Sequence, residues 1–137
     1  MAKRRRGARS AFARRRAETD RFERLVERAL DAIPAPFQAA LDDIAIVIED
    51  DASDEQREIS GLGPDEGLYG LYEGTPRTAW GAESVPFPNK ISLFRIPLEE
   101  DFPDPDDLAD EVRVTVIHEL AHHLGIDDDR LGELGLD

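Results

Sequence analysis

The stretch HELAHHLGIDDD, residues 118–129, contains every histidine of the 137-residue chain. His118 and His122 are spaced so that, in a helix, they share one face and can bind the same metal ion. Glu119 directly follows the first histidine and can reach the attacking water without being a ligand. This is the HExxH arrangement, in which two imidazoles hold zinc and the glutamate serves as general base. The stretch therefore predicts a zinc-dependent hydrolytic centre.

A third ligand must come from elsewhere, because catalytic zinc takes three protein ligands and keeps a fourth position open. Gly125 can adopt a left-handed conformation, end the helix and reverse the chain. Asp128 then follows in the register H-E-x-x-H-x-x-G-x-x-D, at the place where metzincins carry a third histidine. Asp127 and Asp129 are rival candidates. The chain has no cysteine, so His, Asp and Glu are the available ligands.

The histidines are expected on a helix over residues 107–124, capped by Asp106 or Asp107. Its apolar residues cover a wide arc of the helical wheel, which indicates a mostly buried helix. The polar residues of that helix fall in one narrow stripe, which must face water, a cleft or a ligand. The stripe consists of Glu111, Thr115, His118 and His122, with Glu119 at its margin.

Two interpretations of the polar residues compete. Taken singly, a helical histidine is usually a partly exposed side chain, but two histidines, a glutamate, a glycine and an aspartate in this register favour a metal site. His123 points to the apolar side, and we interpret it as structural. Glu111 and Thr115 fit partners of the metal-binding histidines, or a solvated face, equally well.

Elsewhere the pattern predicts further helices and strands. Gly67 and Gly70 lie inside a Leu/Tyr strand pattern, where glycines often mark close approach by another backbone. Tyr69, Tyr72 and Trp80 are assigned to the core or its rim. The expected elements are a helix over 19–32 capped by Thr19 or Asp20, a short helix over 36–41, strands at 44–48 (buried), 67–73 and 90–96, and loops at 49–66, 74–89 and 99–107.

The chain carries a net charge of −14, and this charge is unevenly distributed along the sequence. Residues 1–16 hold eight Lys or Arg and no acid, whereas residues 17–137 hold nine against all 31 Asp and Glu, a balance of −22. We predict a disordered basic arm over 1–17 and one domain over 18–137. The arm is a solvated tail, a segment that folds back on the acidic body of the chain, or a weak contact for nucleic acid or an anionic surface through residues 3–16. No signal peptide or membrane span is expected, which makes the cytoplasm the default location.

The sequence resembles the small bacterial zincin-like metallopeptidase family, described as having a minimal MMP-like domain. The resemblance rests on three stretches, GLYGLYEGTP at 67–76, PNKISLFRIPLE at 88–99 and HELAHHLGIDDDRLGELG at 118–135. The resemblance implies an α+β minimal zincin-like fold: N-terminal helices, a small mixed sheet of three to four strands and a C-terminal active-site helix. It implies Zn²⁺ bound by His118, His122 and Asp128, with Glu119 as the general base. It also implies that 68–73 is the antiparallel edge strand receiving an extended peptide.

Three functions remain open. The leading hypothesis is a zinc-dependent metallopeptidase acting on peptides or proteins. The second is a small zinc-dependent endoribonuclease like the bacterial rRNA-maturation type, although that family has Gly where Glu119 stands and a third His where this chain offers Asp. The third is a non-catalytic module stabilised by zinc. One departure from metzincins is plain: Met1 is the only methionine, so a methionine turn beneath the metal is not expected. Substrate pockets are expected from the 49–66 and 74–89 loops or from a partner.

Overall fold

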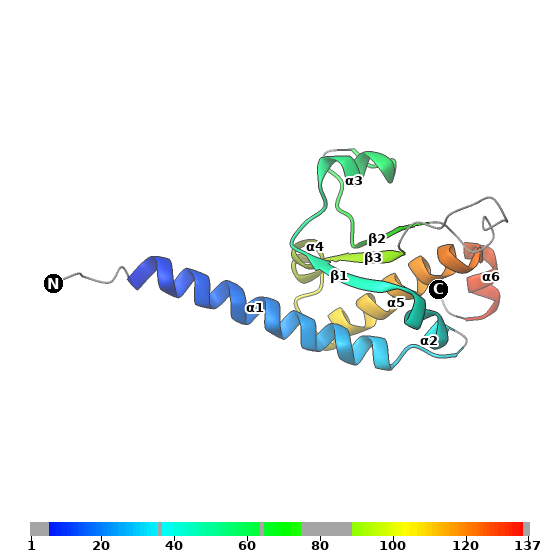
Figure 1. Cartoon of the computed structure of the whole chain (residues 1–137), viewed down its shortest axis with the longest axis horizontal. Coiled ribbons are helices and arrows are strands. Elements are labelled where there is room, and N and C mark those ends of the chain that lie inside the picture. Colours follow the sequence, from blue (N-terminus) through cyan, green and yellow to red (C-terminus); the bar gives the residue numbers. More distant parts are fainter. Residues whose placement is uncertain (1–5, 36, 64, 75–88, 136–137) are drawn as a thin grey trace.

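The computed structural model describes residues 6–35, 37–63, 65–74 and 89–135 (Figure 1). Helices dominate these residues, and three strands form the sheet that they cover. The elements, in chain order, are α1 Arg6–Asp31, α2 Phe37–Ala40, the 3-10 turn η1 Leu41–Asp43, β1 Ala45–Glu49, α3 Asp54–Ile59, β2 Gly70–Glu73, β3 Lys90–Phe94, α4 Arg95–Asp101, α5 Pro105–Leu124 and α6 Asp128–Glu133.

The sheet is mixed, with strand order β1-β3-β2. β1 pairs with β3 in parallel and β2 pairs with β3 in antiparallel, so β2 forms one edge of the sheet. This confirms the expected α+β fold with a small mixed sheet. The expectation of a buried strand at 44–48 is wrong, because β1 is the other edge and its side chains are only partly covered. The buried strand is β3, in which Ile91, Leu93 and Phe94 are fully covered.

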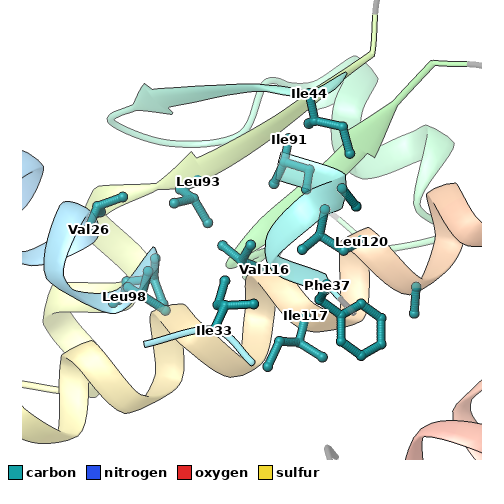
Figure 2. Close-up of a cluster of buried hydrophobic side chains, with 14 of the residues drawn as sticks. Val26, Ile33, Phe37, Ile44, Ile91, Leu93, Leu98, Val116, Ile117 and Leu120 are labelled. Atoms are coloured by element: carbon teal, nitrogen blue, oxygen red, sulfur yellow. The ribbon is translucent and has the colours of Figure 1, made fainter. Parts of the chain in front are cut away.

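Helices α1 and α5 cover one face of the sheet, and α3 stands on the opposite side (Figure 1). The core lies between the sheet and the helices α1 and α5, and it gathers side chains from α1, α2, β3, α4 and α5 (Figure 2). Burying one such large aliphatic or aromatic side chain stabilises the fold by about 1.5–3 kcal/mol. Figure 2 labels Val26, Ile33, Phe37, Ile44, Ile91, Leu93, Leu98, Val116, Ile117 and Leu120.

Helix α1 is longer than the sequence predicts. It begins at Arg6, so residues 6–17, which the sequence assigned to a disordered arm, are helical. Neither Thr19 nor Asp20 caps it, because both lie inside the helix, and the Thr19 hydroxyl donates to the Arg15 carbonyl oxygen at 2.9 Å. The division of the chain into an arm and a domain near residue 17 stays a prediction.

Two helices occupy segments that the sequence assigned to loops or a strand. α3 lies within the expected 49–66 loop and begins with a capping box, in which the Ser53 side chain accepts from the Gln56 N–H and the Gln56 side chain accepts from the Ser53 N–H. α4 replaces the end of the expected 90–96 strand. Arg95, its first residue, is buried and pairs with Asp50 beyond β1 at 3.1 Å and with Glu99 at 3.2 Å.

Two segments for which the sequence made predictions lie partly outside the described residues. The 74–89 loop, with Trp80, lies outside them apart from its two ends, and so does Pro36 at the start of the expected second helix. Among the helices that are described, none combines the length and apolarity that crossing a membrane requires.

Candidate metal centre

Helix α5 carries the HExxH residues between two well-formed caps. Its N-cap is Asp104, which accepts from the Asp106 and Asp107 N–H groups, with Pro105 as the first helical residue. The predicted caps Asp106 and Asp107 were therefore wrong by two or three residues, since both are donors within the first turn.

The C-terminal end of α5 is Gly125, as predicted. Its φ of 73° is left-handed, and its N–H donates to the His122 carbonyl oxygen. The N–H of Ile126 donates to the Ala121 carbonyl oxygen at 2.8 Å, which completes a Schellman motif. Ile126 packs against the core, so the chain turns back along α5 before α6 begins.

This reversal returns an aspartate to the histidines. Asp128 Oδ1 lies 3.5 Å from His118 Nδ1. Asp127 is instead the N-cap of α6 and accepts from the Arg130 N–H at 2.9 Å. Of the three candidate aspartates, Asp128 is thus the one that the structure brings to a predicted ligand.

Glu119 lies between the sheet and the second histidine. Its side chain is only 15% exposed, and its Oε2 lies 3.3 Å from His122 Nδ1. The same oxygen accepts a hydrogen bond from the backbone N–H of Tyr72 on β2 at 2.9 Å. Burial raises the pKa of the Glu119 carboxyl, and the Tyr72 N–H and both histidines partly oppose that rise.

The predicted site residues form two contacting pairs, His118 with Asp128 and His122 with Glu119, rather than a group around one point. Over residues 6–35, 37–63, 65–74 and 89–135, no three His, Cys, Asp or Glu side chains converge as a metal-binding group. The donor set still fits zinc, because His118 and His122 are one turn apart on α5, His118 touches Asp128, and two imidazoles with one carboxylate are ligands that catalytic zinc accepts. The assignment of these ligands stays a prediction.

A family model described as zincin-like metallopeptidase matches residues 41–136, which is more than half of the chain. The chain belongs to this family. A search of the curated proteins finds no match. Membership in the zincin-like family supports a zinc-dependent metallopeptidase in general terms and implies zinc binding. The matched residues include the whole sheet and α5, and therefore both Glu119 and its partner Tyr72 on β2.

The zincin-like site includes a residue whose role the sequence did not predict. The backbone of Tyr72 binds Glu119, and its hydroxyl donates to Asn89 Oδ1 at 2.8 Å while lying 3.2 Å from His123 Nδ1. His123 is fully buried, as expected of a structural histidine. The Leu/Tyr alternation at 67–73 could have indicated the strand face of Tyr72, but not its partners.

Strand β2 packs closely on α5 at Gly70. A Cβ at this position would lie 2.6 Å from Thr115 Cγ2, so only glycine lets the strand approach the helix. The sequence predicted close approach by a backbone at Gly67 and Gly70; at Gly70 the nearest atom is this side-chain methyl, with the Ser92 carbonyl oxygen at 3.2 Å, and at Gly67 the nearest is Pro97 Cβ at 4.0 Å. Thr115 is buried beneath the strand rather than exposed in the polar stripe, and its hydroxyl lies 3.5 Å from Glu111 Oε1.

Two pockets flank the zincin-like site along the β2 edge. The first, of about 370 Å³, lies beside His118 and Glu119, and the second, of about 580 Å³, lies beside His122 and Asp128. The expected contribution of the 49–66 segment is seen in the first pocket, where Leu62 forms part of the wall. The first is lined by Leu62, Gly67, Leu68, Tyr69, Gly70, Glu111, Val114, Thr115, His118 and Glu119, and the second by Tyr72, Gly74, His122, Gly125, Ile126, Asp127 and Asp128.

Proposed function

We propose that this protein is a zinc-dependent peptidase in which His118, His122 and Asp128 hold the metal and Glu119 is the general base. The observation that carries the proposal is the position of Glu119: a mostly buried carboxylate next to His122, at the edge of the sheet and between two pockets. A general base for peptide hydrolysis needs this combination of access to the reacting centre and partial desolvation.

The outer side of β2, with which no other strand of the described residues pairs, is a place where an extended peptide could add. The Phe94 N–H donates to the Tyr69 carbonyl oxygen, so Tyr69, Leu71 and Glu73 face β3. The backbone groups of Gly70 and Tyr72 therefore point away from β3. A substrate strand added there would place its scissile bond beside Glu119 and its side chains in the flanking pockets.

Zinc, when bound, polarises the scissile carbonyl and makes water a better nucleophile at neutral pH. Glu119 accepts the proton from the attacking water and delivers it to the leaving amine. The raised pKa of Glu119 suits both steps, because it brings the carboxyl closer to the pH at which the enzyme works. The 3.5 Å distance between Asp128 Oδ1 and His118 Nδ1 brings the third proposed ligand close to the first.

The test compares the wild type with Glu119→Ala, His122→Ala and Asp129→Ala, by zinc content and by cleavage of a diverse peptide pool. We expect Glu119→Ala to retain zinc and lose cleavage, and His122→Ala to lose both. Asp129→Ala, a change beside Asp128, should retain both. If zinc-loaded Glu119→Ala cleaves the peptides as fast as the wild type does, Glu119 is not the general base. Zinc binding without any cleavage by the wild type, together with unfolding by a chelator, would instead support a zinc-stabilised binding module.

A further inference from the structure

The pocket beside His118 contains a charged group that the proposed reaction does not use. Most of its wall is apolar and comes from the segment before β2 and from α5, including Leu62, Leu68 and Val114. Apart from His118 and Glu119 at the reacting centre, its one charged lining residue among those described is Glu111. Glu111 lies two turns before His118 on α5, at the other end of the pocket.

Glu111 has few partners for a carboxylate that is partly buried. Its one hydrogen bond among the described residues is with the Thr115 hydroxyl, at the long distance of 3.5 Å. No Lys or Arg in the described part of the chain forms an ion pair with it, whereas Arg57, Arg95 and Arg130 are each paired with an acid. Desolvation raises the pKa of Glu111, and the Thr115 hydrogen bond and the charge of His118 oppose this rise only in part.

A second carboxylate reinforces the negative potential at this end. The Tyr69 hydroxyl, on the pocket wall, donates to Asp101. That hydrogen bond, burial, and the charges of Asp101 and Glu111 together raise the pKa of Tyr69 to about 12. The surrounding chain adds to the same field, because residues 17–137 carry a balance of −22. Such a field attracts cations.

We propose that this pocket binds a lysine or arginine side chain of the substrate, so that the enzyme cleaves next to a basic residue. The methylene stem lies along Leu62, Leu68 and Val114, while the cation pairs with Glu111. The methylene stem thus matches the apolar wall of the pocket, and the cationic group matches the Glu111 carboxylate. This inference rests on the proposed peptidase function and adds its substrate class.

The experiment measures cleavage and binding separately. A set of peptides differing only at the residues next to one central bond carries Lys, Arg, Gln, Leu or Glu there. Cleavage by the wild type is followed by mass spectrometry, and binding to zinc-loaded Glu119→Ala by fluorescence anisotropy. The variants are Glu111→Gln, Glu111→Lys and the matched control Asp110→Asn, which removes a neighbouring charge on α5 outside this pocket. Circular dichroism verifies that each variant is folded.

We expect Lys and Arg peptides to exceed the Gln peptide by about tenfold, the effect of one charge-assisted hydrogen bond. Glu111→Gln should abolish this preference, Glu111→Lys should shift it to the Glu peptide, and Asp110→Asn should leave it unchanged. Cleavage without a basic preference would overturn the inference and keep the peptidase. A basic preference in binding without any cleavage would support the pocket and overturn the peptidase. If the experiment shows neither a basic preference nor any cleavage, both the inference and the proposed peptidase function are overturned.

Discussion

Burial of a carboxylate is the property that Glu111 and Glu119 share on α5. Burial raises the pKa of both groups, and each receives compensation of a different kind. Glu119 accepts from a backbone N–H and lies beside His122, whereas Glu111 has a long contact with a hydroxyl. Under the two proposals, the same physical cause would suit Glu119 to proton transfer and leave Glu111 available to pair with a cation.

The raised pKa of Glu111 predicts a pH dependence of stability in the metal-free protein. A carboxyl whose pKa is higher in the folded state stabilises the fold below its unfolded pKa, and that contribution disappears as pH rises through the folded pKa. Glu111→Gln removes the cost of the buried charge. We therefore expect this variant to unfold at higher urea concentration than the wild type at pH 7, with a smaller difference near pH 4.

Urea denaturation at several pH values measures this difference. Asp110→Asn is again the control, because Asp110 is exposed and should show no comparable pH-dependent gain. A Glu111→Gln variant that is less stable than the wild type at pH 7 would show that the carboxylate has stabilising partners in solution.

At the scale of elements, the turn from α5 to α6 decides where Asp128 lies. Gly125 has a φ of 73°, which a residue with a Cβ adopts at a cost of about 1–2 kcal/mol. Gly125→Ala should therefore destabilise the fold by roughly this amount and displace Asp128 from His118. We expect zinc binding to weaken at least about tenfold, because displacing a proposed ligand should cost no less than losing a residue that only orients one.

Gly61→Ala is the matched control for this prediction. Gly61 has a φ of 74° and no atom within 4 Å of an added Cβ, so it carries the same conformational cost away from the site. Denaturation and zinc titration of both variants should show similar stability losses but a zinc defect only in Gly125→Ala. An equal zinc defect in both would mean that global stability, rather than the turn, controls binding.

The elements with a strong sequence pattern were predicted, and those stabilised by single contacts were missed. The end of α5 at Gly125 and the close approach at Gly70 each follow from one residue type. α3 could have been predicted from the Ser53 and Gln56 capping box. α4 could not, because Arg95 continues the apparent strand 90–96 and its partner Asp50 is distant in sequence. The link from Tyr72 to Glu119 likewise spans 47 residues.

For the whole molecule, the dominant quantity is net charge. The chain carries −14, and outside residues 1–16 the acids exceed the bases by 22. Charges of one sign repel one another in the compact state, and this repulsion weakens as salt shortens the Debye length below about 10 Å.

We therefore expect salt to stabilise the metal-free protein. Raising NaCl from 20 to 500 mM should increase stability by roughly 1 kcal/mol, or Tm by about 3–5 °C, for a chain of this size. Thermal unfolding followed by circular dichroism measures this, and KCl should have the same effect if screening is the cause. A Tm that falls with salt would show that ion pairs such as Arg95–Asp50 outweigh the repulsion.

The hydrogen bond from Tyr72 to Glu119 links the sheet edge to the helix that carries the histidines. Its donor is one of the backbone groups that an added peptide strand would use. A peptide strand that adds to β2 must therefore compete with Glu119 for the Tyr72 N–H. When the peptide accepts this hydrogen bond, the Glu119 carboxylate would be released to receive a proton. Binding of the peptide backbone and activation of the general base would then occur in the same step. Under the proposed function, a molecule that does not pair with β2 would leave the Glu119 carboxylate bound to the Tyr72 N–H and less able to accept a proton.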